Sequence, residues 1–305
     1  MTQTVVAIGA ANVDIHGFTQ KPLLMRDSNP GRIETCLGGV SRNVSENLVK
    51  MGVKTTLITA IGNDAFGRQI REHSTQTGID LSHSLVVPEV QSSTYMAIMD
   101  DTGDMALALS DMSILDMLKV SHLQARASLL RKAPAIVADA GLTSEVMEWL
   151  VNTFPDQKII LDPVSIGKCR RMKSIMGQFY CLKMNQLEAG FLADTVIRND
   201  HDLKVAADRF MAMGVRKIYI TLGAEGVYYR QEGMRGRVEV PPLKPINVTG
   251  AGDAFTAAVV YGELQDWEME RTARFAVGAA AVALMSRHTV SEEMSLDAIQ
   301  RWMHR

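Results

Sequence analysis

The residues best suited to chemistry stand together in segment 247–255, which reads Asn-Val-Thr-Gly-Ala-Gly-Asp-Ala-Phe. Small and apolar residues follow, so this segment is predicted to open a helix. The first N–H groups of a helix lack partners within it and lie at the positive end of its dipole, where they bind anions. Glycines let a phosphate approach the backbone closely. The Gly-Ala-Gly turn therefore predicts an anion site.

Asp253 lies directly after this turn. A carboxylate there would repel a phosphate, so its presence calls for a reason other than anion binding. In phosphoryl transfer the attacking hydroxyl becomes acidic as it bonds to phosphorus, and a positioned Asp can accept its proton. Asp253 is thus a candidate general base. The alternative is an ordinary first-turn helix residue that the dipole favours.

Polar residues follow several predicted strands. Ligands of an open parallel sheet bind just beyond the carboxyl ends of its strands, so these residues indicate a site at one sheet edge. Each of them alone is also explained as a turn former or helix N-cap. The residues are Gly9 followed by Asn12 and Asp14, then Gly62-Asn63-Asp64, Asp139, Asp162, Asn185 and Thr221-Leu-Gly223.

Two shorter motifs are suggestive. Asn185 and Glu188 are three residues apart, on the same side of a helical turn. A Mg²⁺ ion held by one carboxylate, phosphates and water needs little more. Gly38 and Gly39 precede another predicted helix, where they admit a ligand close to the backbone while Asn43 makes a directed contact.

Short apolar runs alternate with amphipathic stretches along most of the chain. The segment Val40 to Met51 is predicted to be helical, with Gly52 at its end. This β-α-β alternation predicts parallel strands, right-handed crossovers and helices on both faces of one doubly wound α/β sheet. The predicted strands are 5–9, 55–62, 135–140, 158–162, 180–184 and 217–223.

Two regions break the alternation and are predicted to be extended. One spans about 14–36; the other, 94–109 within an inserted segment of about 92–110, has the pattern of a hairpin with a turn of Asp, Thr and Gly. The hairpin arms are apolar on both faces. We expect the two regions to form a small β-lid over a ligand and to pair with a second copy in a homodimer. A hairpin buried within a monomer is the alternative.

The composition narrows the function classes. The 305 residues allow two domains or one large unit, and with 47% hydrophobic and 22% charged residues they favour a globular protein. The longest apolar run, 275–285, is too short to cross a membrane. A net charge of −2 argues against nucleic-acid binding. P-loop, dinucleotide, zincin and serine-hydrolase motifs are missing. We expect a cytoplasmic protein.

Together these motifs resemble the ribokinase-like (PfkB) family of carbohydrate and nucleoside kinases, from end to end of the chain. Four segments carry the resemblance in the family's order: Gly38-Gly39-x3-Asn43, Asn185-x-x-Glu188, Thr221-Leu-Gly-Ala-Glu-Gly226 and Asn247-Val-Thr-Gly-Ala-Gly-Asp253. The resemblance implies one ribokinase-like α/β domain over 1–305 with an inserted β-lid. It also implies an ATP- and Mg²⁺-dependent kinase.

The resemblance further implies site roles. Asp253 is the expected base, with the amides of Gly250, Ala251 and Gly252 as anion hole. The residues expected to bind the substrate are Asn12, Asp14, Gly39 and Asn43. Those expected on the nucleotide side are Asn185, Thr221, Gly223, Gly226 and Thr249, with Glu188 holding Mg²⁺ through water.

Within the family the chain looks most like the members that phosphorylate the 5′-hydroxyl of free pseudouridine. The segments Asp27-Ser-Asn-Pro-Gly31 and Asp162-Pro-Val-Ser165 carry this likeness, which implies that Ser28, Thr94 and Lys168 read the base. Lys168 is otherwise a surface residue of a basic run. A ribokinase, another nucleoside or sugar kinase, and a non-catalytic nucleoside-binding protein are the alternatives.

One position departs from many relatives. Asn247 stands where they carry an Asp that is tied to a monovalent-cation site. The loss of that charge leaves K⁺ activation open.

Overall fold

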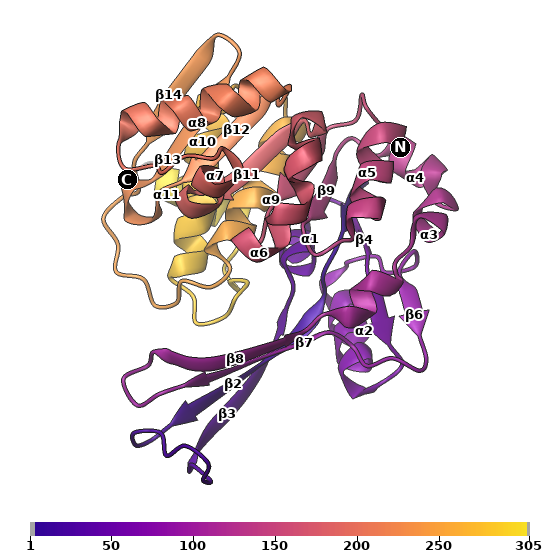
Figure 1. Ribbon diagram of the computed structural model, residues 1–305, viewed down its shortest axis with the longest axis vertical. Helices are drawn as coiled ribbons and strands as arrows, with labels where there is room; N and C mark the ends of the chain where they lie inside the picture. The colour runs from indigo at the N-terminus through magenta and orange to yellow at the C-terminus, as the bar shows by residue number, and fades with distance from the viewer. Residues whose placement is uncertain (1–3, 304–305) are drawn as a thin grey trace.

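The computed structural model of the protein describes residues 4–303. An eight-stranded sheet with helices on both faces forms the body, and a four-stranded sheet projects from it (Figure 1). In this main sheet the neighbouring strands β4, β1, β9, β10, β11 and β12 run parallel. The strands β13 and β14 pair antiparallel at the other edge. In spatial order the strands are β14 (Met234–Val238), β13 (Val227–Gln231), β12 (Lys217–Thr221), β11 (Cys181–Asn185), β10 (Ile159–Asp162), β9 (Ile136–Asp139), β1 (Val5–Ile8) and β4 (Thr55–Ile58).

Successive side chains of the body strands face two separate cores. On β1, Val6 and Ile8 pack into one core while Val5 and Ala7 pack into the other. The first core is covered by α3 (Val120–Gln124), α4 (Ala127–Lys132), α5 (Ser144–Thr153), α6 (Ile166–Cys169), α7 (Gln186–Leu192) and α8 (Asp200–Met213). The second is covered by α1 (Val40–Lys50), α2 (Ala65–Thr77), α9 (Ala251–Leu264), α10 (Met269–Leu284) and α11 (Leu296–Met303). The predicted three-layer doubly wound fold is confirmed.

Helix α1 begins and ends as its glycines predict. Gly39 precedes it with a φ of 97°, and a side chain there would collide with the carbonyl of Ala10. Gly52, with a φ of 82°, follows its end. These two glycines fix where the helix enters and leaves the sheet edge, because other residues rarely adopt such angles.

The projecting sheet, called the lid sheet below, is built from both regions predicted to be extended. Its strands in spatial order are β3 (Gly31–Gly38), β2 (Asn12–Thr19), β7 (Thr94–Met99) and β8 (Met105–Asp111). The register places Asp14 and His16 on one face and Met96, Leu107 and Leu109 on the other. Leu107 and Leu109 are 58% and 63% exposed. The lid sheet therefore carries an uncovered apolar face.

The predicted strand 55–62 is wrong in one respect. Its apolar run continues, but the strand leaves the main sheet after Ile58, and β5 (Ala60–Gly62) pairs with β6 (Leu85–Val87) instead. The strands β13 and β14 were not expected, because charged residues interrupt their apolar pattern. Short 3₁₀-helices cover Ser113–Met117, Arg170–Gln178 and Gly223–Glu225. Among residues 4–303 no helix is both long and apolar enough to span a membrane.

The buried carboxylate of Asp139, at the end of β9, binds the loop after β1, the first turn of α1 and the loop after β9. One oxygen accepts hydrogen bonds from the Ala10 N–H at 2.8 Å and the Ser41 hydroxyl at 2.6 Å. The other accepts from the Gly141 N–H at 2.8 Å. Removal of this carboxylate leaves buried donors without partners, which is costly.

We expect Asp139→Ala to lower the free energy of unfolding by about 2–4 kcal/mol, because it strands several buried donors. Urea denaturation of the purified variant measures the change. Asp156→Ala, at an exposed position, is the control and should change stability by about 0.5 kcal/mol or less. An equal loss in both variants would contradict the role given to Asp139.

Candidate active site

The start of α9 confirms the turn that the sequence predicts. Gly250 has a φ of 84°, and a side chain there would collide with the carbonyl of Thr289. The first helical bond runs from the Ala254 N–H to the Gly250 carbonyl, at 2.9 Å. The N–H groups of Gly250, Ala251, Gly252 and Asp253 therefore lack helical partners, and these four include the three expected to form the anion hole, Gly250, Ala251 and Gly252. These free donors suit an anion.

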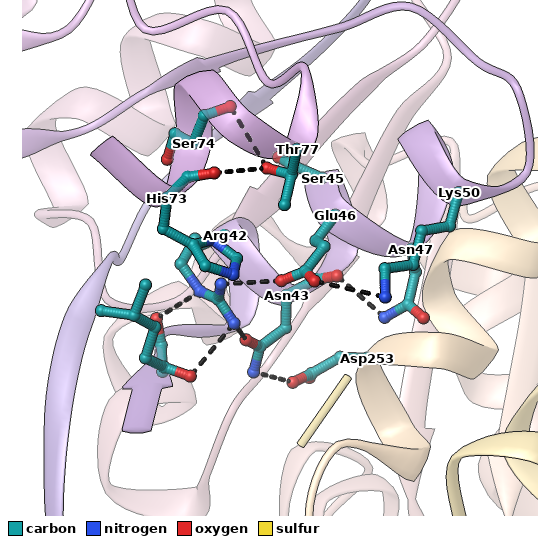
Figure 2. A network of polar contacts seen from close by, with 12 residues as sticks. Arg42, Asn43, Ser45, Glu46, Asn47, Lys50, His73, Ser74, Thr77 and Asp253 are labelled. Carbon is teal, nitrogen blue, oxygen red and sulfur yellow. Dashed lines mark hydrogen bonds and ion pairs between the residues drawn. The ribbon is translucent and has the colours of Figure 1, made fainter. Parts of the chain in front are cut away.

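Asp253 lies on the first turn of α9 and contacts helix α1. Its carboxylate accepts a hydrogen bond from the Asn43 side-chain amide at 2.6 Å (Figure 2). Burial raises the pKa of Asp253 to about 7, and the negative charge of Asp162 adds to the rise. The bond from Asn43 and the charges of Lys183 and Arg42 oppose it. A carboxyl group with a pKa near neutrality suits proton transfer.

Lys183, which was not predicted as a site residue, occupies the centre of this edge. Its ammonium lies 3.1 Å from a carboxylate oxygen of Asp162, which also accepts a bond from the Thr256 hydroxyl at 2.9 Å. A side chain built at Gly252 would lie 2.8 Å from the Lys183 nitrogen. The cation therefore sits directly beneath the glycine turn. A lysine inside the apolar run 180–184 was the available signal.

The charge state of Lys183 follows from its neighbours. Burial lowers its pKa, but the negative charges of Asp162, Asp253 and Glu188 outweigh this effect and raise the pKa above its usual value. The lysine is thus a permanent positive charge at the point where the α9 amides converge.

Asn185 and Glu188 bond to each other across the start of α7. The Asn185 side chain accepts from the Glu188 N–H at 2.9 Å, and the Glu188 carboxylate accepts from the Asn185 N–H at 2.8 Å. This is a capping box, so the pair also has a structural role. Burial raises the pKa of Glu188, and Asp162 contributes.

The donor set suits a loosely held ion. Within the described range 4–303 no three His, Cys, Asp or Glu side chains come together as a metal cage. A single carboxylate ligand such as Glu188 fits a metal that keeps phosphate and water ligands, as Mg²⁺ does.

A cavity of about 530 Å³ opens beside the glycine turn. Its lining includes Thr221, Gly223 and Gly226. Ala251 and Gly252 line it at the glycine turn, where the free amides lie. Thr249 is exposed just before α9. Much of the remaining wall is apolar, including the proline-rich segment 241–245. The apolar lining beside the free amides of α9 suits a ligand with an apolar ring and an anionic tail.

Asn12 and Asp14 lie where the lid sheet leaves the body. The Asn12 amide donates to the Asp14 carboxylate at 2.5 Å, and burial raises the pKa of Asp14. Gly38 is needed beside them because a side chain there would collide with the Asp14 carboxylate. Together with Gly39 they surround the start of α1, on which Asn43 lies.

The three residues expected to read a base lie on three different segments. Ser28 is in the exposed loop between β2 and β3, at the far end of the lid sheet (Figure 1). Lys168 is partly exposed on α6. Thr94 pairs with Val13, so its side chain lies on the opposite face of the lid sheet from Asp14.

Comparison with known proteins supplies the family. Residues 2–294 match the model of the pfkB family carbohydrate kinases. The chain is 32% identical to the pseudouridine kinase of Escherichia coli (strain K12), over 96% of this chain and 94% of the relative. It is 25% identical to the guanosine-inosine kinase of Exiguobacterium acetylicum, over 97% and 99%.

The fold is shared with solved structures. The ribokinase of Arabidopsis thaliana, complexed with ribose and ATP, superposes with a TM-score of 0.85 over the whole of both chains, at 17% identity. Taken with the family match and the kinase relatives, this gives the chain its place: it belongs to the pfkB family of carbohydrate kinases and is a phosphotransferase with an alcohol acceptor.

Proposed function

We propose that the protein transfers the γ-phosphoryl group of ATP to the 5′-hydroxyl of free pseudouridine. The observation that carries the reaction is the Asp253 carboxyl group, held by Asn43 beside the free amides of α9. The choice of pseudouridine rests on the 32% identity with the Escherichia coli enzyme of that name.

In the proposed step the 5′-oxygen bonds to the γ-phosphorus as the bond from that phosphorus to the β,γ-bridging oxygen breaks. The hydroxyl proton passes to Asp253, and ADP leaves with the electron pair of the broken bond. The amides of α9 and the ammonium of Lys183 stabilise the charge on the transferred group. Asn12, Asp14 and Asn43 hold the ribose hydroxyls.

The nucleotide is proposed to lie in the cavity beside α9, with its adenine among the apolar side chains and its phosphates toward Gly252. Asn185 and Glu188 would hold Mg²⁺ through water. The bound ion neutralises phosphate charge. Ser28 and Lys168 are proposed to read the base, helped by the part of the lid sheet around Thr94.

Asn247 supports independence from K⁺. Its amide N–H donates to the Arg287 carbonyl at 3.2 Å, and its oxygen accepts from the Thr249 N–H at 2.9 Å. A neutral amide, already bonded to the Arg287 carbonyl and the Thr249 N–H, stands where a charged cation ligand would be needed.

A panel of acceptors tests the substrate. We expect ADP release with pseudouridine to exceed that with uridine, cytidine, adenosine, ribose and fructose, and to be equal in Na⁺ and K⁺ buffers. Ribose as the best acceptor would favour ribokinase activity, and no release from any acceptor would favour a non-catalytic nucleoside-binding protein.

Lys168→Met is the matched variant for base recognition. Its kcat/KM should fall at least about tenfold for pseudouridine and change little for ribose, because only the nucleoside carries a base. Equal losses on both acceptors would remove Lys168 from the base site.

The raised pKa of Asp253 predicts a pH profile. The base acts as the carboxylate, so kcat/KM should rise with pH, with a midpoint near 7. Asp253→Asn should lower kcat by about three orders of magnitude or more, because it removes the proton acceptor. Initial rates between pH 5 and 9 provide the measurement. A flat profile together with an active Asn variant would exclude this base.

We also propose that two copies pair through the apolar face of the lid sheet. Met96, Leu107 and Leu109 give this face exposed apolar area that a partner would bury. Analytical ultracentrifugation should show a dimer that Leu107→Asp dissociates, with Asp101→Asn at the hairpin turn as control. A wild-type monomer would contradict the pairing.

A further inference from the structure

Arg42 is a buried arginine whose bonds converge beside the site. Its side chain is 2% exposed, and it donates to the carbonyls of Gly38 at 3.1 Å and Leu37 at 3.0 Å. It also donates to the Glu46 carboxylate at 2.8 Å and to the Asn43 side-chain oxygen at 2.5 Å (Figure 2). The guanidinium is thus fixed at the start of α1 by four acceptors.

The contact with Asn43 decides which way that amide faces. A side-chain amide has an oxygen end and an NH₂ end, and either can be turned toward a neighbour. Arg42 can only donate, so it holds the oxygen end and turns the NH₂ end toward Asp253. A reversed amide would place an oxygen against the carboxylate and an NH₂ group against a cation.

We propose that Arg42 is a positioning residue for the phosphoryl transfer, acting through the Asn43 amide on the orientation of the Asp253 carboxylate. The proposal rests on the role of Asp253 given above. Arg42 itself makes its bonds to backbone carbonyls and to Glu46 and Asn43, and its influence on the reacting atoms is indirect.

Glu46 supplies the negative charge opposite Arg42. Glu46 is 5% exposed, and its second oxygen lies 3.6 Å from the Lys50 ammonium, which donates to the Ser291 carbonyl at 2.8 Å. His73 of α2 faces the same pair, and burial lowers its pKa, so it is neutral at pH 7. The positive charge opposite Glu46 at neutral pH therefore comes from Arg42 and Lys50.

The charge of Arg42 provides a second readout. The charged groups that act on Asp253 come from three elements: Asp162 of β10, Lys183 of β11 and Arg42 of α1. Of these, Asp162 raises the pKa of Asp253 and the two cations lower it. Loss of the arginine charge should move the pH midpoint of kcat/KM upward.

A double-mutant cycle tests the indirect action. Arg42→Met and Arg42→Lys are each made in the wild-type and Asn43→Ala backgrounds, with the acceptor that the wild type uses best. Arg42→Met should lower kcat about 10- to 100-fold in the wild-type background, because a small misplacement of the base is enough. In the Asn43→Ala background, Arg42→Met should change kcat less than about twofold, because the amide that connects Arg42 with Asp253 is gone.

Arg42→Lys separates charge from geometry. It keeps the positive charge, so the pH midpoint should stay within about 0.3 units of the wild type. It cannot reach all four acceptors, so kcat should still fall. Lys50→Met is the matched control: it removes the other cation near Glu46 without touching Asn43, and it should keep both kcat and the pH midpoint.

Wild-type kcat in both Arg42 variants would overturn the proposal, as would equal losses in the two Asn43 backgrounds. Thermal unfolding and ATP-analogue binding show which variants are folded, and if Arg42→Met is not, the cycle with Arg42→Lys decides. If pseudouridine is not the substrate, the double-mutant cycle is still valid, because it uses whichever acceptor of the panel the wild type phosphorylates best. An active Asp253→Asn would remove the base and so fail separately from the Arg42–Asn43 coupling.

Discussion

The ammonium group of Lys183 balances the carboxyl groups that the fold brings together at one edge of its main sheet. Asp162 lies against it, and Asp253 and Glu188 are close enough to raise its pKa. Buried carboxylates without such a partner would strongly destabilise the fold. Because the same ammonium lies beneath Gly252, the charge that makes the edge stable also makes it attractive to an anion.

The environment of Asp253 raises the pKa of its carboxyl group, which suits the proposed proton transfer but lowers the stability of the fold at neutral pH. In an unfolded chain the group has a pKa near 3.8, and in the folded chain it has one near 7. The folded state therefore binds the proton more tightly, and this group's contribution to stability declines as pH rises from about 4 to 7 and stays low above that. The contact with Asn43 limits the loss by stabilising the carboxylate. A carboxylate stabilised further would have a lower pKa and would accept a proton less readily.

Much of the fold follows from local patterns. The extent of α1, the hairpin of β7 and β8 and the glycine turn before α9 depend on nearby residues, and the sequence predicts them. The break after Ile58 does not, because the apolar run is continuous and tertiary pairing decides where the strand leaves the sheet. The face on which Thr94 lies depends on a one-residue register that composition cannot reveal.

The polar contacts were harder to foresee. Lys183 stands out as a lysine within an apolar run, but its role is unknown until Asp162, on the neighbouring strand, is placed beside it. Arg42 resembles a surface residue of a helix until Leu37, Gly38 and Glu46 enclose it. Their partners come from chain geometry rather than from residue type, so the sequence pattern does not reveal which groups they contact.

The bond between Asn43 and Asp253 joins residues 210 positions apart in the chain. During synthesis α1 leaves the ribosome long before α9 and α10, which cover the same core as α1. A partly made chain therefore has α1 without the Asp253 carboxylate opposite Asn43 and without two of the helices that cover this core. Completion of this core and formation of the Asn43–Asp253 contact both wait for α9, so a chain that ends before α9 has neither.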